Sequence, residues 1–242
     1  KLAEVKRRLY GVRAKRVWPG RDEKILTAWN GLMIAALAKA GAAFGDDRYV
    51  DAAVNAADWC LAHLRDSNGR LFRSAGADGK ARLNGYLEDY AFLADALATL
   101  YEATFEAKWL KAAGELADVM LKHFADPNGS GFFFVADDHE ELIARTKEVH
   151  DGSTPSGNAV AVTVLLRLAK LLDRPAYAAK AEAALRASRD TMAEHPMASG
   201  QMLLALDFHL GPTQEVAVIG GGDPEDTNRA VDAVRRAFRP NQ

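Results

Sequence analysis

A two-helix unit of about 60 residues recurs along this chain and constrains its fold more than any other feature. Tyr49 and Trp109 lie 60 residues apart, and so do His63 and His123. The segments HLRDSNGRLF and HFADPNGSGFF begin at these two histidines, and both contain an Asn-Gly turn followed by an aromatic residue. Because a helix, a turn and an aromatic segment all match at one offset, we interpret the chain as helical hairpins stacked side by side.

The spacing of apolar residues predicts the helices themselves. Apolar residues recur at i, i+3, i+4 and i+7 almost throughout, which is the spacing of one buried helical stripe. Helices are predicted at about residues 27–45, 48–64, 87–105, 107–124, 156–172 and 175–193, and a further one begins within SGQMLLALDFHL. In the first helix, Thr27 is the expected N-cap and Gly45 the expected end. Its expected buried stripe consists of Trp29, Leu32, Met33, Ala36, Leu37 and Ala40.

The segments that follow the Asn-Gly turns, residues 69–85 and 129–157, are long and carry aromatic residues and expected short strands. Common open solenoids use shorter repeats, of about 34–47 residues. We therefore predict an all-α-dominated (α/α)6 toroid, in which an inner ring of helices opens onto a cavity rimmed by long loops. Only about three and a half hairpins can be counted, so we expect a partial ring that lacks its N-terminal hairpins.

The C-terminal segment departs from the repeat. We expect residues 1–212 to form the helical-hairpin domain and residues 213–242 to form a strand–helix appendage packed on it. QEVAVIGGG is predicted to be a short strand, and the helix after it has Asp223 as the expected N-cap and Pro224 at its first position. A glycine-rich turn before a helix can hold a phosphate. Neither G-x-G-x-x-G nor G-x-x-x-x-G-K-[ST] is present, which favours a packing role.

Composition argues against several classes of protein. The formal net charge of −2 gives no reason to expect nucleic acid or an anionic membrane as a partner. No run approaches the roughly 18 apolar residues of a membrane span, and the opening KLAEVKRRLYG lacks the apolar core of a secretory signal. The single cysteine, Cys60, cannot form an intrachain disulfide and fits a reducing, cytoplasmic compartment. Its apolar helical neighbours indicate an inert buried thiol rather than a nucleophile.

Four segments together resemble one known family. They are KILTAWNGLMIAALAKAG (24–41), LEDYAFLADALATLYEATFEAKWL (87–110), DGSTPSGNAVAV (151–162) and SGQMLLALDFHLGPTQEVAVIGG (199–221). In this order they look like the C-terminal part of the spermatogenesis-associated thioredoxin-domain family. The resemblance implies a thioredoxin-like domain as partner in the full-length chain, and a toroid similar to N-acylglucosamine 2-epimerases and six-hairpin glycosidases. It implies no settled activity, and no redox role falls to this chain because C-x-x-C is absent.

The first turns of three inner-type helices supply the candidate substrate-binding residues. If the toroid forms, these helix ends surround one mouth, where aromatic platforms and hydrogen-bonding groups suit a sugar. The alternative is ordinary, since acidic and small polar residues also favour helix N-termini through capping and the helix dipole. The candidates are Trp29, Asn30, Tyr86, Glu88, Tyr90, Ser156 and Asn158.

Acid–base chemistry has three candidate residues, Asp89, Asp151 and His150. Adjacent helical residues point about 100° apart, so Glu88 and Asp89 do not face each other across a scissile bond. Asp89 is the stronger candidate because it precedes the inward stripe of its helix, and Asp151 beside His150 suits proton transfer. Two functions stay open: epimerase, isomerase or glycosidase chemistry on a sugar, and a non-catalytic ligand- or protein-binding module.

The remaining histidines carry weaker expectations. His63 and His123 lie late in the outer helices, where they are expected to cap carbonyls. Epimerases of the resembled fold use histidines at the mouth, and only His150 occupies a comparable loop here. No metal ion and no cofactor are expected, because H-x-x-x-H, C-x-x-C and closely clustered carboxylates are all absent.

Overall fold

The predicted hairpins are confirmed by a computed structural model, which describes residues 1–139, 143–214, 216–220, 222 and 224–235. The described helices are α1 (Leu2–Arg13), α2 (Thr27–Phe44), α3 (Asp47–His63), α4 (Leu87–Thr104), α5 (Ala107–His123), α6 (Gly157–Leu171), α7 (Pro175–Ala187), α8 (Arg189–Glu194), α9 (Gly200–Leu210) and α10 (Pro224–Arg235). A short 3-10 helix spans Pro196–Ala198. The strands are β1 (Ile25–Leu26), β2 (Phe72–Ala75) and β3 (Ala81–Asn84).

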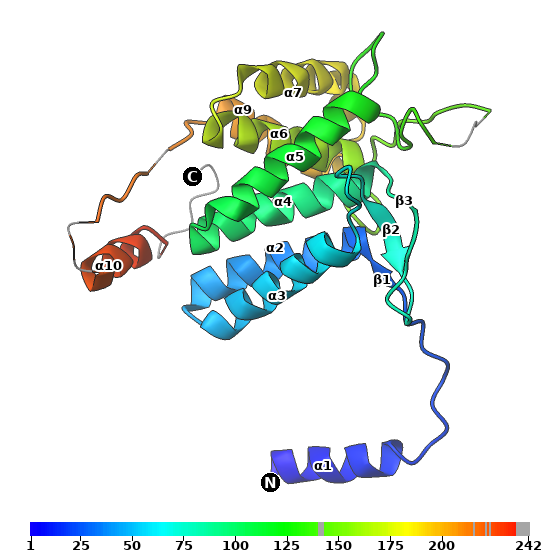
Figure 1. Cartoon of the computed structure of the whole chain (residues 1–242), viewed down its shortest axis with the longest axis vertical. Coiled ribbons are helices and arrows are strands. Elements are labelled where there is room, and N and C mark those ends of the chain that lie inside the picture. Colours follow the sequence, from blue (N-terminus) through cyan, green and yellow to red (C-terminus); the bar gives the residue numbers. More distant parts are fainter. Residues whose placement is uncertain (140–142, 215, 221, 223, 236–242) are drawn as a thin grey trace.

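The helices form two layers (Figure 1). The inner row contains α2, α4, α6 and α9, each packed on the next, while α3, α5 and α7 each cover the inner helix that precedes them in the chain. Helix α4 lies in the middle of the row, and Leu93, Leu97 and Leu100 on it are fully buried. The structure therefore has the architecture of a partial (α/α) ring.

A left-handed residue turns each hairpin. Gly45 follows α2 with φ 64°, Phe105 follows α4 with φ 57°, and Asp173 follows α6 with φ 50°. Glycine adopts this region without steric cost, which explains the first turn and confirms Gly45 as the end of α2. The short links that result place each outer helix antiparallel to its inner helix.

A small sheet joins the first two hairpins at the end where α2 and α4 begin. Strands β1, β2 and β3 pair antiparallel in that order, with Leu26 opposite Ser74 and Phe72 opposite Asn84. The expected strands after the first Asn-Gly turn are thus present. In the described part of residues 125–156, an isolated bridge between Ala125 and Phe132 takes the place of strands.

Two expectations for α2 are wrong. Leu26 occupies the N-cap position and Thr27 is the first helical residue, where its hydroxyl donates to the Phe72 carbonyl at 2.5 Å. Trp29 and Met33 in the expected stripe are 62% and 58% exposed. The buried face is the opposite one, because α4 and α3 pack there and α2 lies at the end of the row. It consists of Thr27, Ala28, Gly31, Ile34, Ala35, Ala38 and Gly41.

The C-terminal segment matches its prediction in the helix and differs in the strand. Residues 216–220 are exposed and form no strand, because no neighbouring strand offers them an edge in the part of the chain that is described. Arg235 at the end of α10 donates to the Glu102 and Ala103 carbonyls of α4, at 2.7 and 2.9 Å. The expected N-cap, Asp223, lies outside the described residues, and the boundary between residues 212 and 213 stays a prediction.

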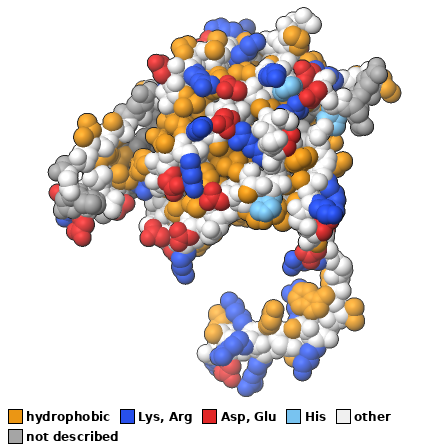
Figure 2. All heavy atoms as spheres, in the orientation of Figure 1, with side chains coloured by type: hydrophobic (Ala, Val, Ile, Leu, Met, Phe, Trp, Pro, Cys, Tyr) orange, Lys and Arg blue, Asp and Glu red, His pale blue; other side chains and the backbone are white. Residues whose placement is uncertain are grey.

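Helix α1 stands apart from the hairpins, below them in Figure 1. It has no buried residue. Figure 2 shows many basic side chains gathered on it, interspersed with hydrophobic ones. Among the described helices, none combines the length and the apolar character needed to cross a bilayer.

Candidate functional site

The N-terminal ends of the inner helices converge, as the toroid prediction requires. A Cβ added to Gly31 of α2 would lie 2.7 Å from the Phe92 carbonyl carbon of α4, so these two backbones are in close contact. A Cβ on Gly157, the first residue of α6, would lie 3.3 Å from the Glu88 nitrogen of α4. We call this end of the ring, formed by the first turns of α2, α4, α6 and α9, the mouth.

Asp89 is fully buried at the mouth and connects two helices. Its Oδ1 accepts from the Ala28 backbone nitrogen of α2 at 3.0 Å, and its Oδ2 accepts from the Tyr86 nitrogen at 2.8 Å. Arg73 of β2 lies 3.3 Å from both oxygens. Burial raises the pKa of Asp89 to about 6, although the Arg73 charge and the Tyr86 hydrogen bond act in the opposite direction. The inward orientation expected for Asp89 is confirmed, and its contacts are those of a structural bridge.

Asp151 makes the same kind of bridge between α6 and α9. Its Oδ1 accepts from the Ser156 nitrogen, which precedes α6, and its Oδ2 accepts from the Gln201 nitrogen in α9, both at 2.8 Å. A carboxylate is well suited to this task because it accepts two backbone donors at once and favours the positive end of a helix dipole. Asp89, within the first turn of α4, thus connects back to α2, and Asp151, in the loop before α6, connects forward to α9.

Glu88 is a carboxylate at the mouth that reaches solvent. Its side chain is 18% exposed and forms an ion pair with Arg73, whose side chain is 22% exposed. The Arg73 guanidinium also lies 5.2 Å from the ring centre of Tyr86, which stacks on Phe134 at 4.7 Å. An acceptor, a donor and an aromatic ring thus lie together. Arg73 was not predicted, since it lies on a strand after a turn and carries no motif.

Most of the other predicted binding residues hold backbone in place. Ser156 caps α6 by accepting from the Ala159 nitrogen, and Asn158 binds the Phe132 backbone through its Oδ1 and Nδ2, at 2.8 and 2.9 Å. The Tyr90 hydroxyl is buried and accepts from the Leu71 nitrogen at 2.7 Å.

In the first turn of α2, one candidate side chain is hydrogen-bonded to backbone and the other is exposed to solvent. Asn30 donates to the Leu26 carbonyl at 2.8 Å, within its own helix end. Trp29 stays largely exposed. Of the two, Trp29 has the larger exposed side-chain surface.

Of the two histidines expected to cap carbonyls, His63 does so and His123 does not. His150 is exposed and its ring meets that of His195 edge-on, with centroids 6.0 Å apart. His63 Nδ1 donates to the Trp59 carbonyl at 3.0 Å, in agreement with a capping role. His123 instead lies 2.7 Å from the Asp137 carboxylate.

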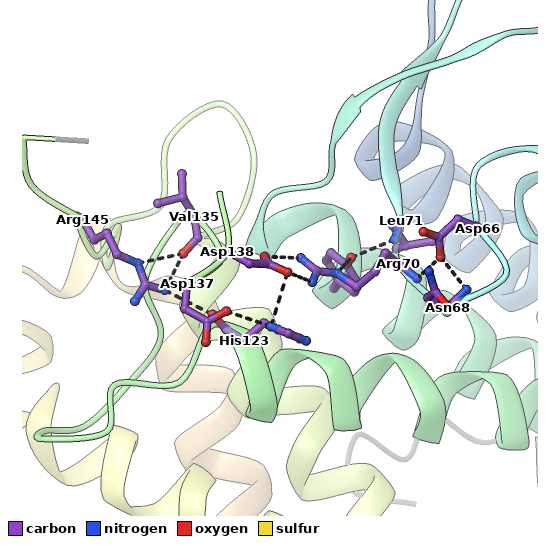
Figure 3. Close-up of polar contacts among 10 residues, drawn as sticks. Asp66, Asn68, Arg70, Leu71, His123, Val135, Asp137, Asp138 and Arg145 are labelled. Carbon is purple, nitrogen blue, oxygen red and sulfur yellow. Dashed lines mark hydrogen bonds and ion pairs between the residues drawn. The ribbon is translucent and has the colours of Figure 1, made fainter. Parts of the chain in front are cut away.

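Figure 3 shows His123 between two carboxylates, a grouping that the sequence did not reveal. Its Nδ1 lies 2.7 Å from Asp137 and 3.8 Å from Asp138, and one ligand atom from each of the three residues lies within 4.8 Å of the others. Such a set could hold a divalent ion. However, Arg70 pairs with both oxygens of Asp138, and this hydrogen bonding lowers the pKa of the carboxyl. Asp138 is thus already neutralised by a protein cation.

Two surface hollows border the loop before α2 and the outer helix α3. One, of about 530 Å³, lies between Arg21–Ile25, Trp59 and the turn at Gly76–Gly79. A second, of about 390 Å³, is lined by Lys24, Ile25, Asn30, Ala56 and Trp59. Asn30 is the predicted site residue that borders one of them.

Known proteins resemble this chain in sequence. Residues 24–135 match the family model described as Glycosyl hydrolase family 76. Over 97% of its length, the chain is 35% identical to spermatogenesis-associated protein 20 of Rattus norvegicus and 34% identical to that of Homo sapiens. The resemblance to this family is confirmed. The chain spans about a third of these curated relatives, 31% of each.

Solved structures share the fold at low identity. The cellobiose 2-epimerase of Spirochaeta thermophila matches 71% of this chain and 44% of its own, with a TM-score of 0.58 and 19% identity. A GH76 α-mannanase of Bacteroides thetaiotaomicron matches 70% of this chain and 42% of its own, with a TM-score of 0.54 and 16% identity. A D-mannose isomerase matches 77% and 44%, with a TM-score of 0.55 and 17% identity. The predicted six-hairpin glycosidase-like fold is confirmed.

Proposed function

We propose that this domain binds a carbohydrate at its mouth, with Glu88, Arg73 and Tyr86 as the contact residues. The fold is that of the cellobiose 2-epimerase, the α-mannanase and the D-mannose isomerase. The glycosidase family match at residues 24–135 includes all three contact residues and Trp29. These likenesses support a sugar as the ligand class and leave the individual sugar open.

The observation that carries the proposal is the partly exposed Glu88–Arg73 pair beside the Tyr86 ring. A carboxylate accepts hydrogen bonds and a guanidinium donates them, so the pair can bind two neighbouring hydroxyl groups of a sugar. The Tyr86 ring, which stacks on Phe134 and His139, can contact the apolar side of a sugar ring with its uncovered edge. Trp29, exposed on the neighbouring helix end, can extend this surface.

Catalysis, where it occurs, falls to Glu88 rather than to Asp89. Both oxygens of Asp89 and both of Asp151 accept backbone hydrogen bonds, and Asp89 is also fully buried. The Glu88 carboxylate pairs with the Arg73 side chain instead of with backbone nitrogens, and His150 is exposed on the loop before α6. Glu88 would act as acid or base on the bound sugar with His150 as the second group.

The engagement of Asp89 and Asp151 also favours a second function. In it, the domain binds its ligand without turnover, as a module of a larger protein that carries a thioredoxin-like domain. For either function we propose a cytoplasmic location, because a chain with a single cysteine fits a reducing compartment.

A ligand screen with matched variants tests the proposal. Cellobiose, mannose and an N-acylglucosamine would be titrated by calorimetry into the wild type, Glu88→Gln and Tyr49→Ala. Tyr49, on the outer helix α3, is a control aromatic residue away from the mouth. We expect Glu88→Gln to weaken binding at least tenfold, a loss of about 1.4 kcal/mol in binding free energy. Tyr49→Ala should bind like wild type.

Product analysis separates the two functions. Conversion or cleavage of the sugar that stops in Glu88→Gln supports the enzyme, and binding without new products supports the module. If none of the sugars binds, or if Glu88→Gln binds them unchanged, the mouth is not a carbohydrate site.

A further inference from the structure

Two exposed histidines meet where the loop before α6 contacts the loop before α9. The rings of His150 and His195 lie edge-on, with centroids 6.0 Å apart and planes at 75°. Both residues are exposed, and apart from this contact neither ring has a hydrogen-bond or ion-pair partner in the described part of the chain. Imidazole is the commonest metal ligand in proteins, and it suits zinc, copper and nickel ions. Two such rings side by side are therefore a candidate metal site.

The backbone fixes the two histidines relative to each other. The Asp151 nitrogen, next to His150, donates to the Ala198 carbonyl at 2.8 Å, and the Ala198 nitrogen donates to the His195 carbonyl at 3.0 Å. The Asp151 carboxylate also accepts from the Gln201 nitrogen of α9. The two loops are thus hydrogen-bonded to each other, and an ion between the rings would need side-chain rotation only. Ligands held in advance by their backbone bind a metal with less loss of entropy.

The separation of the rings fits one shared ion. A zinc ion lies about 2.0 Å from a histidine nitrogen, and hence about 3.2 Å from the ring centre. Two rings on one ion then have centres about 5.2 Å apart at a tetrahedral angle and about 6.4 Å apart when they lie opposite each other. The observed 6.0 Å is between these limits. Small rotations of two exposed side chains would direct one nitrogen of each ring to the same point.

A buried hydroxyl at the same junction lacks a partner. Ser199, the residue after Ala198, is 1% exposed, and its Oγ has no hydrogen-bond partner among the residues that the structure describes. Folded proteins pair nearly all buried hydroxyls with protein, water or an ion. The unpaired Ser199 hydroxyl is an observation independent of the histidine rings, and it also indicates a polar ligand at this junction.

We propose that His150 and His195 together bind one divalent transition-metal ion at the α9 side of the mouth. Nitrogen ligands favour zinc, copper and nickel over magnesium and calcium, which take oxygen ligands. Two protein ligands leave the other positions of the ion open to water or to an oxygen of a bound molecule. The set around His123 is a poorer site, because Arg70 already pairs with Asp138 there (Figure 3).

The site was not predictable from motif spacing, since the two histidines lie 45 residues apart in the chain (195 − 150). It also bears on the proposed sugar chemistry. A His150 bound to a metal has no free lone pair to accept a proton, so occupancy by the ion and the role of His150 as the second acid–base group exclude each other. Metal binding itself is measured without sugar, and its failure is therefore distinguishable from failure of the carbohydrate proposal.

Zinc titration of the untagged chain tests the proposal. Zinc chloride would be titrated by calorimetry into the wild type, His150→Ala, His195→Ala and His209→Ala, the last being a control histidine within α9. We expect the wild type to bind one zinc ion per chain. Each of the first two variants should bind zinc at least about tenfold more weakly, because each removes one of two protein ligands. His209→Ala should bind zinc like the wild type, and magnesium chloride should give no binding at the pair.

Two further measurements identify the ligands. His195→Cys replaces one zinc ligand by another and should retain zinc binding that His195→Ala loses. Electron paramagnetic resonance of the Cu²⁺-loaded chain should show two coordinated nitrogens in the wild type and one in His195→Ala. Absence of zinc binding, or unchanged zinc affinity in either alanine variant of the pair, would overturn the proposal. Zinc binding that is lost in His123→Ala and kept in His195→Ala would do so as well, because the ion would then occupy the His123 set.

Discussion

The Oδ1 of Asp89 lies 3.0 Å from the backbone nitrogen of Ala28, a residue 61 positions earlier in the chain. A carboxylate in the first turn of α4 thereby completes the first turn of α2. Asp151 repeats the arrangement between α6 and α9. Helix N-termini have backbone donors that lack intrahelical partners, so each bridge satisfies donors on two helices and fixes their relative height.

Replacing Asp89 should cost stability. Asp89→Ala leaves the buried Ala28 and Tyr86 nitrogens without acceptors, and we expect a loss of about 2 kcal/mol in the free energy of unfolding at pH 5. Denaturant titration measures it. Asp89→Asn retains one acceptor oxygen and should cost less. Glu88→Gln is the neighbouring control, with a change below about 0.5 kcal/mol because its partner Arg73 is partly exposed. An Asp89→Ala variant as stable as wild type would rule out the bridge.

The stability contributed by Asp89 should depend on pH in an unusual direction. Its pKa is raised in the folded protein to about 6, from a reference value of 3.8. The folded state therefore holds this proton more tightly than the unfolded state, and the contribution is largest below pH 3.8 and falls as pH rises to about 6. We expect the stability difference between wild type and Asp89→Ala to shrink over this range and to be constant above it. A difference that grows with pH would contradict the raised pKa.

Asp151 should stabilise the end of the inner row locally. Asp151→Ala removes the acceptor for the Gln201 nitrogen, so hydrogen exchange of the α9 amides should accelerate more than that of α4. The control is Asp190→Ala, which removes an exposed acidic residue of α8, the helix that precedes α9 in the sequence. Equal exchange in both variants would show that α9 does not depend on the bridge.

The repeat allowed the hairpins to be predicted, because apolar spacing and turn residues are local signals. The direction of burial on α2 was not predictable in the same way. Its apolar residues occur on more than one side, so the stripe through Trp29 and Met33 looked as suitable as the one through Ala28 and Ile34. The side of an inner helix that is buried depends on where its neighbouring helices lie. In the described chain, α2 has an inner-row neighbour, α4, on one side only.

The candidate residues lie near helix starts as predicted, but their contacts there were not predicted. Asp89, Asp151, Ser156 and Asn158 do lie at helix starts around one mouth, and there they bind backbone atoms. Whether a polar residue at a helix start caps the helix or contacts a ligand depends on distant partners. Arg73 shows this most clearly, since only the fold of the β2–β3 hairpin brings it to Glu88.

Cys60 should be unreactive in the folded protein. It is 1% exposed, and burial raises the pKa of its thiol to about 12. Because the thiolate is the nucleophile, alkylation by iodoacetamide at pH 8 should be negligible until denaturant unfolds the chain. Mass spectrometry follows the modification, and a free cysteine peptide in the same tube is the control. Rapid labelling without denaturant would show that α3 opens easily.

Gly31 should be the least replaceable glycine of the inner row. A Cβ at this position would lie 2.7 to 2.9 Å from backbone atoms of Phe92 and Leu93, which cannot rotate away as a side chain can. Gly31→Ala must therefore push α2 and α4 apart at the mouth, and we expect a loss of about 3 kcal/mol, the upper end for overpacking. Gly11→Ala is the matched control, because nothing lies within 4 Å of its added Cβ. In that exposed helix alanine is favoured over glycine by about 1 kcal/mol. The melting temperature should thus fall for Gly31→Ala and not for Gly11→Ala. Equal melting temperatures for the two variants would mean that α2 and α4 are not in backbone contact.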